Sequence, residues 1–236
     1  MIDKLKNAIE KANKIVFFTG AGMSTDSGIP DFRSETGLYK NNLHAEEIIS
    51  HSYFMSDPQG FYDFYKEKMI FPNAKPNYGH LFISKLQENK DVKVVTQNID
   101  GLHQMAGSKE VYELHGSIHR NYCMRCHNFY SLADILKPKG IPYCECGGIM
   151  KPDVVLYEEG LDEDTIGKAI NAIMNAELLI ILGTSLNVYP AASFIRYFKG
   201  DTLAIINKSA TSADNTCDIV IHDSISKTFR EIDYNK

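Results

Sequence analysis

Three polar residues that would be costly to bury without a function follow short strand-like runs. Asn98 and Asp100 come after Val92–Val95, and His115 comes after Val111–Tyr112. The carboxyl ends of parallel strands share one edge of an open α/β sheet, and ligands bind at that edge. A histidine titrates near neutrality, so His115 is the natural general base there. The alternative for this residue taken alone is a histidine buried for packing.

A glycine-rich segment, Gly20–Gly28, follows the apolar run Ile15–Thr19. A buried strand that leads into closely spaced glycines, and then into residues suited to capping a helix, can hold a pyrophosphate on backbone N–H groups. Thr25 stands where the dehydrogenase fingerprint has its third glycine. A tight turn without a ligand is the alternative for the two glycines alone. The continuation Ile29–Arg33 favours a dinucleotide, because a proline, an aromatic ring and a guanidinium could cover its far end.

Four cysteines form two close pairs, Cys123-x-x-Cys126 and Cys144-x-Cys146. Four thiolates can surround one tetrahedral Zn²⁺, and in a cytosolic chain such spacing favours a metal over disulfides. We expect a closed, structural site because the protein supplies all four ligands. The C-x-C turn is tighter than usual, so zinc loss through weakened coordination is the alternative. Cys217 is expected in the core.

The chain alternates helical periodicity with short β-branched runs, which is typical of parallel βαβ units. Helical stripes are expected at Ile2, Leu5, Ile9 and Ala12, at Leu81, Ile83 and Leu86, and at Ile166, Ala169, Ile170, Ile173 and Met174, with a further helix from Pro190 to Gly200. Strands are expected at Ile15–Thr19, Val92–Thr96, Leu178–Leu182, Leu203–Ile206 and Ile219–Ile221. Two stretches interrupt the alternation: 32–76 indicates a helical insertion, and 117–150 a metal-stapled module.

Composition sets further limits on function. The 236 residues include 44% apolar residues, which is ample for a core, and the net charge of −5 would repel nucleic acid. The longest apolar run, Leu178–Leu182, is far short of the ~20 residues that span a membrane. The N-terminus lacks the apolar core of a signal peptide. We therefore expect a cytoplasmic protein with neither nucleic-acid nor membrane partners.

With these motifs the chain resembles the sirtuins, the NAD-dependent protein-lysine deacylases. The segments that carry the resemblance are Gly20–Arg33, Thr96–His103, Glu113–Gly116 and the cysteine quartet, and Gly183–Ser185 and Asn207 extend it. The resemblance implies a Rossmann-like parallel sheet flanked by helices, with a smaller domain and a substrate cleft between the two. The large domain would comprise 1–31, 77–116 and 151–236, and the small domain the helical insertion 32–76 and the zinc-ribbon module 117–150.

The resemblance also implies a reaction, in which the acyl oxygen of a modified lysine attacks the ribose carbon that carries nicotinamide. His115 would be the base that activates a ribose hydroxyl, and Asn98 would orient water or ribose. Asp100 and Ile99 would bind the nicotinamide amide, and Phe32 would shield the reacting carbon. The other expected cofactor-binding residues are Gly20, Ala21, Gly22, Thr25, Arg33 and Gln97 around the phosphates and ribose, and Gly183, Thr184, Ser185, Asn207 and Ile225 around the adenosine half.

The remaining histidines carry weaker signals. His103 lies in the Thr96–His103 motif and could cap a helix as easily as touch the cofactor. The others are expected on the surface or in packing roles: His44, His51, His80, His119, His127 and His222.

Acetyl-lysine peptides or proteins are the expected partners, lying as an extended strand beside Val154, Val155, Leu156 and Tyr157. Backbone pairing of this kind tolerates many sequences. Glu158 stands where the family usually has glycine, so its side chain either faces solvent or alters the backbone contacts. Succinyl-preferring deacylases carry Tyr-x-x-Arg in the insertion, whereas Tyr65 takes the arginine position here. Neutral acyl groups, acetyl first, are therefore expected.

Other functions compete with a deacetylase. A Rossmann oxidoreductase would explain the glycines but neither the cysteines nor Asp31–Arg33. A non-catalytic NAD-sensing or zinc-scaffold module has no need of both Asn98 and His115. Mono-ADP-ribosyl transfer shares the first step, and longer neutral acyl groups are a further possibility. The complete motifs Thr96–His103 and Glu113–Gly116 favour deacetylation.

Overall fold

Six parallel strands form the main sheet of the computed structural model, which describes residues 1–32, 37 and 44–234. The strand order is β3-β2-β1-β7-β8-β9. Their bounds are Lys14–Thr19 for β1, Asp91–Thr96 for β2, Val111–Glu113 for β3, Leu178–Leu182 for β7, Thr202–Ile206 for β8 and Ile219–Ile221 for β9. Because β1 pairs with both β2 and β7, the strand order reverses there, and a crevice forms at the carboxyl ends of such strands.

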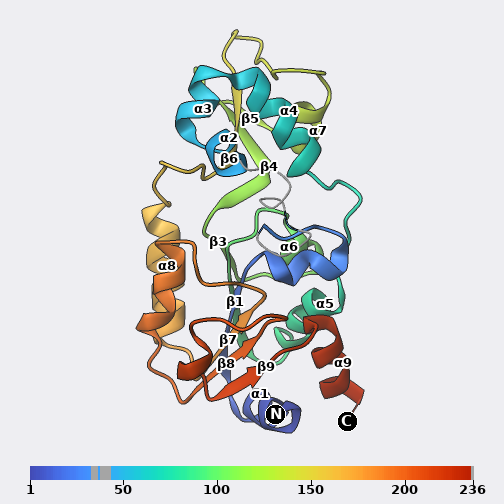
Figure 1. The fold of residues 1–236 in the computed structure, drawn as a ribbon, viewed down its shortest axis with the longest axis vertical. Coiled ribbons are helices and arrows are strands. Elements are labelled where there is room, and N and C mark those ends of the chain that lie inside the picture. The colour runs from blue at the N-terminus through green and yellow to red at the C-terminus, as the bar shows by residue number, and fades with distance from the viewer. Residues whose placement is uncertain (33–36, 38–43, 235–236) are drawn as a thin grey trace.

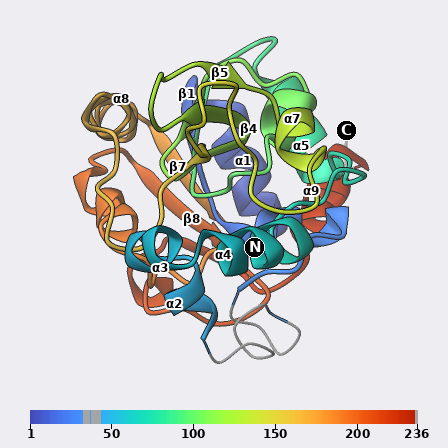
Figure 2. The ribbon, with the colours of Figure 1, turned by 90° about the horizontal axis from the view of Figure 1, so that it is seen from above.

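Helices cover both faces of this sheet, because alternate side chains of a buried strand point to opposite faces. Phe17 of β1 packs with α1 (Ile2–Lys11), α5 (Tyr78–Leu86) and α9 (Ile225–Tyr234). Phe18, on the other face, packs with α8 (Glu163–Met174) and the 3-10 helix η2 (Ala191–Tyr197). Figures 1 and 2 show α8 on one side of the sheet, and α5 and α9 on the other.

A smaller antiparallel sheet, in the order β5-β4-β6, lies at the other end of the elongated molecule (Figure 1). It consists of β4 (Gly116–Cys123), β5 (Phe129–Tyr130) and β6 (Met150–Val154), and α2 (Ala45–Ile48), α3 (His51–Ser56), α4 (Pro58–Lys68) and α7 (Leu132–Leu136) lie around it. Phe61, Tyr62 and Tyr65 of α4 share one core with Cys123 and Cys144. Two segments far apart in the sequence therefore build one hydrophobic unit.

The predicted fold class is confirmed, with three local differences. Leu81 is 49% exposed, because α5 buries its His80, Phe82 and Ile83 instead. The helix expected to begin at Pro190 is the short 3-10 helix η2, which ends at Tyr197. Strand β6 pairs with β4, so residues 151–154 join the small sheet although the expected domain boundary falls at 150/151.

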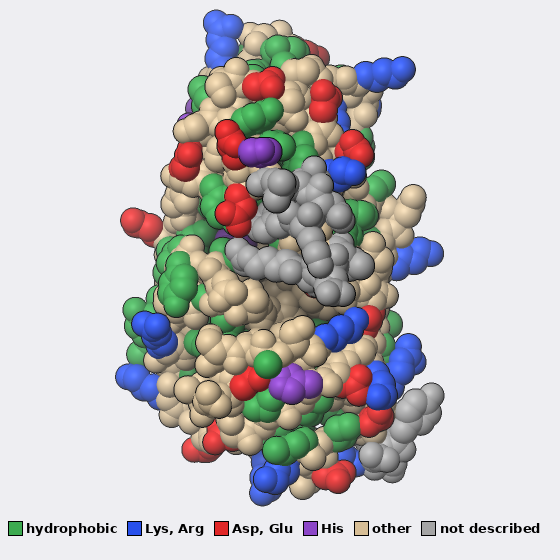
Figure 3. All heavy atoms as spheres, in the orientation of Figure 1, with side chains coloured by type: hydrophobic (Ala, Val, Ile, Leu, Met, Phe, Trp, Pro, Cys, Tyr) green, Lys and Arg blue, Asp and Glu red, His purple; other side chains and the backbone are tan. Residues whose placement is uncertain are grey.

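The remaining described elements are the 3-10 helices η1 (Ala21–Ser27) and η3 (Asp214–Thr216) and the short helix α6 (Leu102–Met105). Within the described residues, no helix combines the length and hydropathy needed to cross a membrane. On the face drawn in Figure 3, basic and acidic side chains of the described residues are interspersed.

Candidate active site

The glycine turn after β1 packs directly against the turn after β7. The Gly22 N–H donates to the Gly183 carbonyl at 2.8 Å, and a Cβ on Gly22 would lie 2.7 Å from the Gly183 Cα. Gly183 itself has a φ of +58°, which a glycine adopts without strain. The Gly20 N–H donates to Leu182. These glycines are therefore needed for close approach of two chain segments, and a phosphate would have to use other donors of η1.

The loop after β2 holds its polar side chains through Ser24 of η1. The Ser24 hydroxyl donates to Asp100 Oδ2 at 2.6 Å and accepts from Asn98 Nδ2 at 3.1 Å. The Leu102 N–H donates to Asp100 Oδ1 at 2.9 Å. Burial raises the pKa of Asp100, and the hydrogen bond from Ser24 opposes that shift. Ser24 thus fixes the relative positions of the expected catalytic amide and carboxyl groups.

His115 lies between β3 and β4, with its imidazole oriented by the same loop. Its Nδ1 lies 2.9 Å from the Gln97 carbonyl oxygen, which can only accept a hydrogen bond. The neutral ring therefore carries its proton on Nδ1 and leaves Nε2 as the basic nitrogen. Burial lowers the pKa of His115, and the Gln97 carbonyl opposes this only in part. At neutral pH this histidine is an unprotonated base.

A cavity of about 970 Å³ collects the expected site residues at the carboxyl ends of the strands. Its lining includes Gly20, Ala21, Gly22, Thr25, Phe32, Gln97, Asn98, Ile99, Asp100, His115, Val154, Val155, Leu156, Tyr157, Gly183, Thr184, Ser185, Asn207 and Ile225. Arg33 lies outside the described residues. The helical insertion contributes Lys68, Met69 and Phe71, so the cavity lies between the two sheets. Its size suits a dinucleotide together with part of a second substrate.

Several cavity-lining residues were not predicted from the sequence, and two of them, Ser24 and His119, contact Asp100. Ser24 lies between Gly20 and Gly28, so its position in the glycine motif was a signal that could have marked it. His119 was expected in a surface or packing role and is indeed exposed, but it also lines the cavity, and its Nε2 lies 3.1 Å from the Asp100 carbonyl oxygen. Only the fold places it there, since β4 runs back past the Asp100–Gly101 turn. His103 lies within α6, is buried, and is not among the lining residues.

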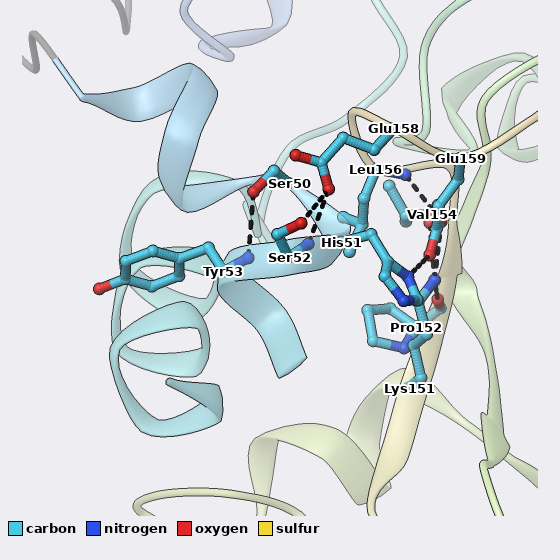
Figure 4. A network of polar contacts seen from close by, with 10 residues as sticks. All are labelled: Ser50, His51, Ser52, Tyr53, Lys151, Pro152, Val154, Leu156, Glu158 and Glu159. Carbon is cyan, nitrogen blue, oxygen red and sulfur yellow. Dashed lines mark hydrogen bonds and ion pairs between the residues drawn. The ribbon is translucent and has the colours of Figure 1, made fainter. Parts of the chain in front are cut away.

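The strand expected to bind peptide is joined to α3 by two adjacent carboxylates (Figure 4). Glu158 has a φ of +76°, and its carboxylate accepts from the Ser52 N–H at 2.9 Å and the Ser52 hydroxyl at 2.6 Å. These bonds lower the pKa of Glu158. The backbone of Tyr157 pairs with Ile49 and His51. The Glu158 side chain, though exposed, is therefore engaged by the helical insertion.

Glu159 makes the second half of this connection. Its Oε1 lies 2.9 Å from His51 Nδ1, and its Oε2 lies 3.0 Å from both Lys151 Nζ and the Leu156 N–H. Burial would raise the pKa of Glu159, but these partners lower it below its ordinary value. The carboxylate thus joins β6, the turn after it and the start of α3.

Tyr65, the residue compared with a succinyl-binding arginine, is fully buried in the core of the small module. Neither it nor Tyr62 is among the residues that line the cavity. Burial raises the pKa of both phenols. The preference for neutral acyl groups therefore stays a prediction.

The four expected zinc ligands come together in the small module, with all four Sγ atoms within 4.8 Å of one another. Cys123 and Cys146 are 3.4 Å apart, and Cys126 and Cys144 are 3.5 Å apart. A tetrahedral zinc with Zn–S bonds of about 2.3 Å separates its sulfurs by about 3.8 Å, so the set fits one ion. Tyr130 donates to Cys144 Sγ at 2.9 Å. None of the four cysteines is among the cavity-lining residues, as expected of a structural site.

The reversal of strand order, the cavity above it and the cysteine-held module define an α/β nucleotide-binding protein with a structural metal site. The sequence pattern described as "SIR2: Sir2 family" matches residues 20–190. The chain belongs to the Sir2 family.

Relatives match over nearly the whole chain. It is 57% identical to an NAD-dependent protein deacetylase of Clostridium perfringens, covering 98% of both chains. It is 45% identical to an NAD-dependent protein deacetylase of Staphylococcus aureus, covering 98% of this chain and 97% of that one. A solved Sir2 structure with a p53 peptide and NAD⁺ has a TM-score of 0.88 and 37% identity, covering 100% of this chain and 98% of that one.

Proposed function

We propose that the protein is an NAD-dependent protein-lysine deacetylase that transfers the acetyl group of acetyl-lysine to ADP-ribose and releases nicotinamide. The names of its relatives and the ligands of the similar Sir2 structures support this activity. One observation carries the chemistry: His115 presents a neutral imidazole, oriented through Gln97, in the same cavity as Asn98 and Asp100.

NAD would supply the ribose carbon that reacts and the nicotinamide that leaves. Ser24 holds Asn98 and Asp100 in place, so Asn98 can orient ribose or water and Asp100 can accept from the nicotinamide amide. His115 Nε2 then accepts a proton from a ribose hydroxyl, while Nδ1 keeps its proton and donates it in the hydrogen bond to the Gln97 carbonyl oxygen. Phe32 would exclude water from the reacting carbon.

The acetylated segment would lie extended beside Val154–Tyr157, between the large domain and the small domain, whose sheet includes β6 up to Val154. The Val155 N–H donates to the His115 carbonyl at 3.0 Å, so the base and the peptide-binding strand are in direct contact. Acetylated proteins of the cytoplasm are the proposed partners. The net charge of −5 argues against nucleic acid.

The experiment is nicotinamide release from NAD with an acetyl-lysine peptide, followed by the peptide mass. We expect loss of the acetyl mass with the wild type and none with His115→Ala. The exposed His44→Ala is the matched control and should retain activity. A gain of ADP-ribose mass would instead support mono-ADP-ribosyl transfer, and NAD binding without turnover would support a non-catalytic module.

A further inference from the structure

Two buried histidines outside the cavity have no role in the proposed reaction. His80 lies in the first turn of α5, and His103 lies in α6. Their rings are 4.7 Å apart between centroids, and both are almost completely buried. Burial lowers the pKa of His80 to about 4 and that of His103 well below its ordinary value. Both imidazoles are therefore neutral, with one N–H donor and one acceptor nitrogen each.

Their neighbours decide which nitrogen carries the proton. The Asn77 N–H donates to His80 Nδ1 at 3.2 Å, so the His80 proton is on Nε2. The Thr19 hydroxyl donates to Thr96 Oγ1 at 2.8 Å. With its single proton used there, Thr19 can only accept from His103 Nε2, which lies 3.1 Å away. The acceptor nitrogen of His103 is therefore Nδ1.

The two remaining ring atoms complement each other. His80 Nε2–H is a donor and His103 Nδ1 is an acceptor, and neither has a hydrogen-bond partner among the described residues. Leaving both unpaired in the interior is costly. The ring centroids are 4.7 Å apart, so a direct hydrogen bond from His80 Nε2–H to His103 Nδ1 would need only a small rotation and would satisfy both atoms. The bonds would then run in one direction, from Asn77 through His80, His103 and Thr19 to Thr96.

Both ends of this chain of hydrogen bonds hold loops of the cavity. Thr96 Oγ1 accepts the Asn98 N–H at 3.0 Å. At the other end, Asn77 Nδ2 donates to the Met23 carbonyl at 2.8 Å and to Ser27 Oγ at 3.0 Å, both in η1. The start of α5 thus supports η1 and the Gln97–Gly101 loop on the side away from the cavity. Ser24 joins the same two segments on the cavity side.

We propose that His80 and His103 are positioning residues, a neutral imidazole pair that holds the Gln97–Gly101 loop at its working distance from η1. The proposal rests on the proposed roles of Asn98 and Asp100. Neither histidine touches the reacting atoms, so each acts through Thr19, Thr96 and the Asn98 backbone.

Two substitutions break this chain of hydrogen bonds without touching the cavity. Thr19→Val removes one buried hydroxyl at nearly constant volume. His80→Asn keeps an acceptor for the Asn77 N–H but loses the Nε2 donor. Thr228→Val is the matched control, because Thr228 of α9 has a buried hydroxyl that donates to the Ser224 carbonyl, outside this chain of bonds.

The readouts are kcat per folded enzyme, the KM for peptide, and hydrogen–deuterium exchange of the amides at 97–103. We expect Thr19→Val and His80→Asn each to lower kcat roughly tenfold, because a misplacement of catalytic groups by about 1 Å can cost about 100-fold and a loosened loop should shift them by less. Peptide KM should be unchanged and exchange at 97–103 faster. The double variant should lose little more than either single one, because both break the same chain of bonds.

The proposal is overturned if both variants lower Tm as Thr228→Val does but keep wild-type kcat and loop exchange, or if their losses in kcat multiply. An inactive wild type would contradict the proposed function instead. The exchange measurement would then still decide whether the imidazole pair holds the loop.

Discussion

At the scale of single residues, His115 owes its basicity to its surroundings. Burial lowers its pKa, so the ring loses its proton below the ordinary histidine value of about 6.5. A base must be unprotonated, and kcat/KM should therefore rise with pH along an acidic limb centred below pH 6.5. The measurement is a pH profile of kcat/KM for the acetylated peptide, with peptide binding followed separately. A limb centred above pH 6.5 that binding does not explain would contradict this assignment.

Glu158 combines an uncommon backbone conformation with a specific partner. A φ of +76° costs a residue with a Cβ more than it costs glycine. Glu158→Ala removes the bonds to Ser52 and keeps that strain, whereas Glu158→Gly removes both. We expect both variants to raise the KM for peptide a few-fold and leave the KM for NAD unchanged, with Glu158→Ala the less stable. Ser56→Ala, elsewhere on α3, should match the wild type. Equal KM values for peptide in all variants would show that the Glu158–Ser52 bonds do not hold the peptide-binding strand.

At the scale of elements, the turns after β1 and β7 depend on their close approach. A Cβ on Gly22 would meet Gly183 backbone at 2.7 Å, which no side-chain movement can relieve. Gly22→Ala should therefore lower the unfolding free energy by about 1–3 kcal/mol and weaken NAD binding. Gly167→Ala on α8 is the control, because its Cβ meets open space and alanine favours the helix by up to about 1 kcal/mol. Urea unfolding measures the stability of both variants, and NAD titration measures their affinity. Wild-type NAD affinity in Gly22→Ala would show that the cofactor site does not depend on this close approach.

Elements also show how far sequence reasoning reaches. Apolar runs such as Leu178–Leu182 predicted the buried strands, because a short continuous apolar run is typical of a parallel strand that is buried on both faces. Every described residue that local motifs predicted to bind cofactor or peptide lines the cavity, but much of the remaining lining comes from segments that no motif marked. The prediction that Leu81 belongs to the buried stripe of α5 is wrong, since the buried face of this helix is set by contact with α9. The place of His119 in the cavity lining could not be predicted, because it depends on the course of β4 past Asp100, a contact between segments that no local pattern records.

At the scale of the whole molecule, the stability of the helical insertion should depend on the cysteine site. Cys123 and Cys144 share a core with Phe61 and Tyr65 of α4, although the two segments are far apart in sequence. If one zinc ion holds the cysteine segment, its removal exposes that core, and a structural zinc site contributes directly to folding.

Chelation or Cys126→Ser should therefore increase hydrogen–deuterium exchange in α4 as well as in β4. Amides of β1 and β7 should stay protected, because their core packs against α1, α5, α8 and α9. Peptide binding should be lost before the main sheet unfolds, since the strand beside the cavity is anchored to α3 through Glu158 and Glu159. Cys217→Ser, outside the quartet, is the control. Protection of α4 that survives metal removal would mean that the aromatic core alone holds the insertion in place.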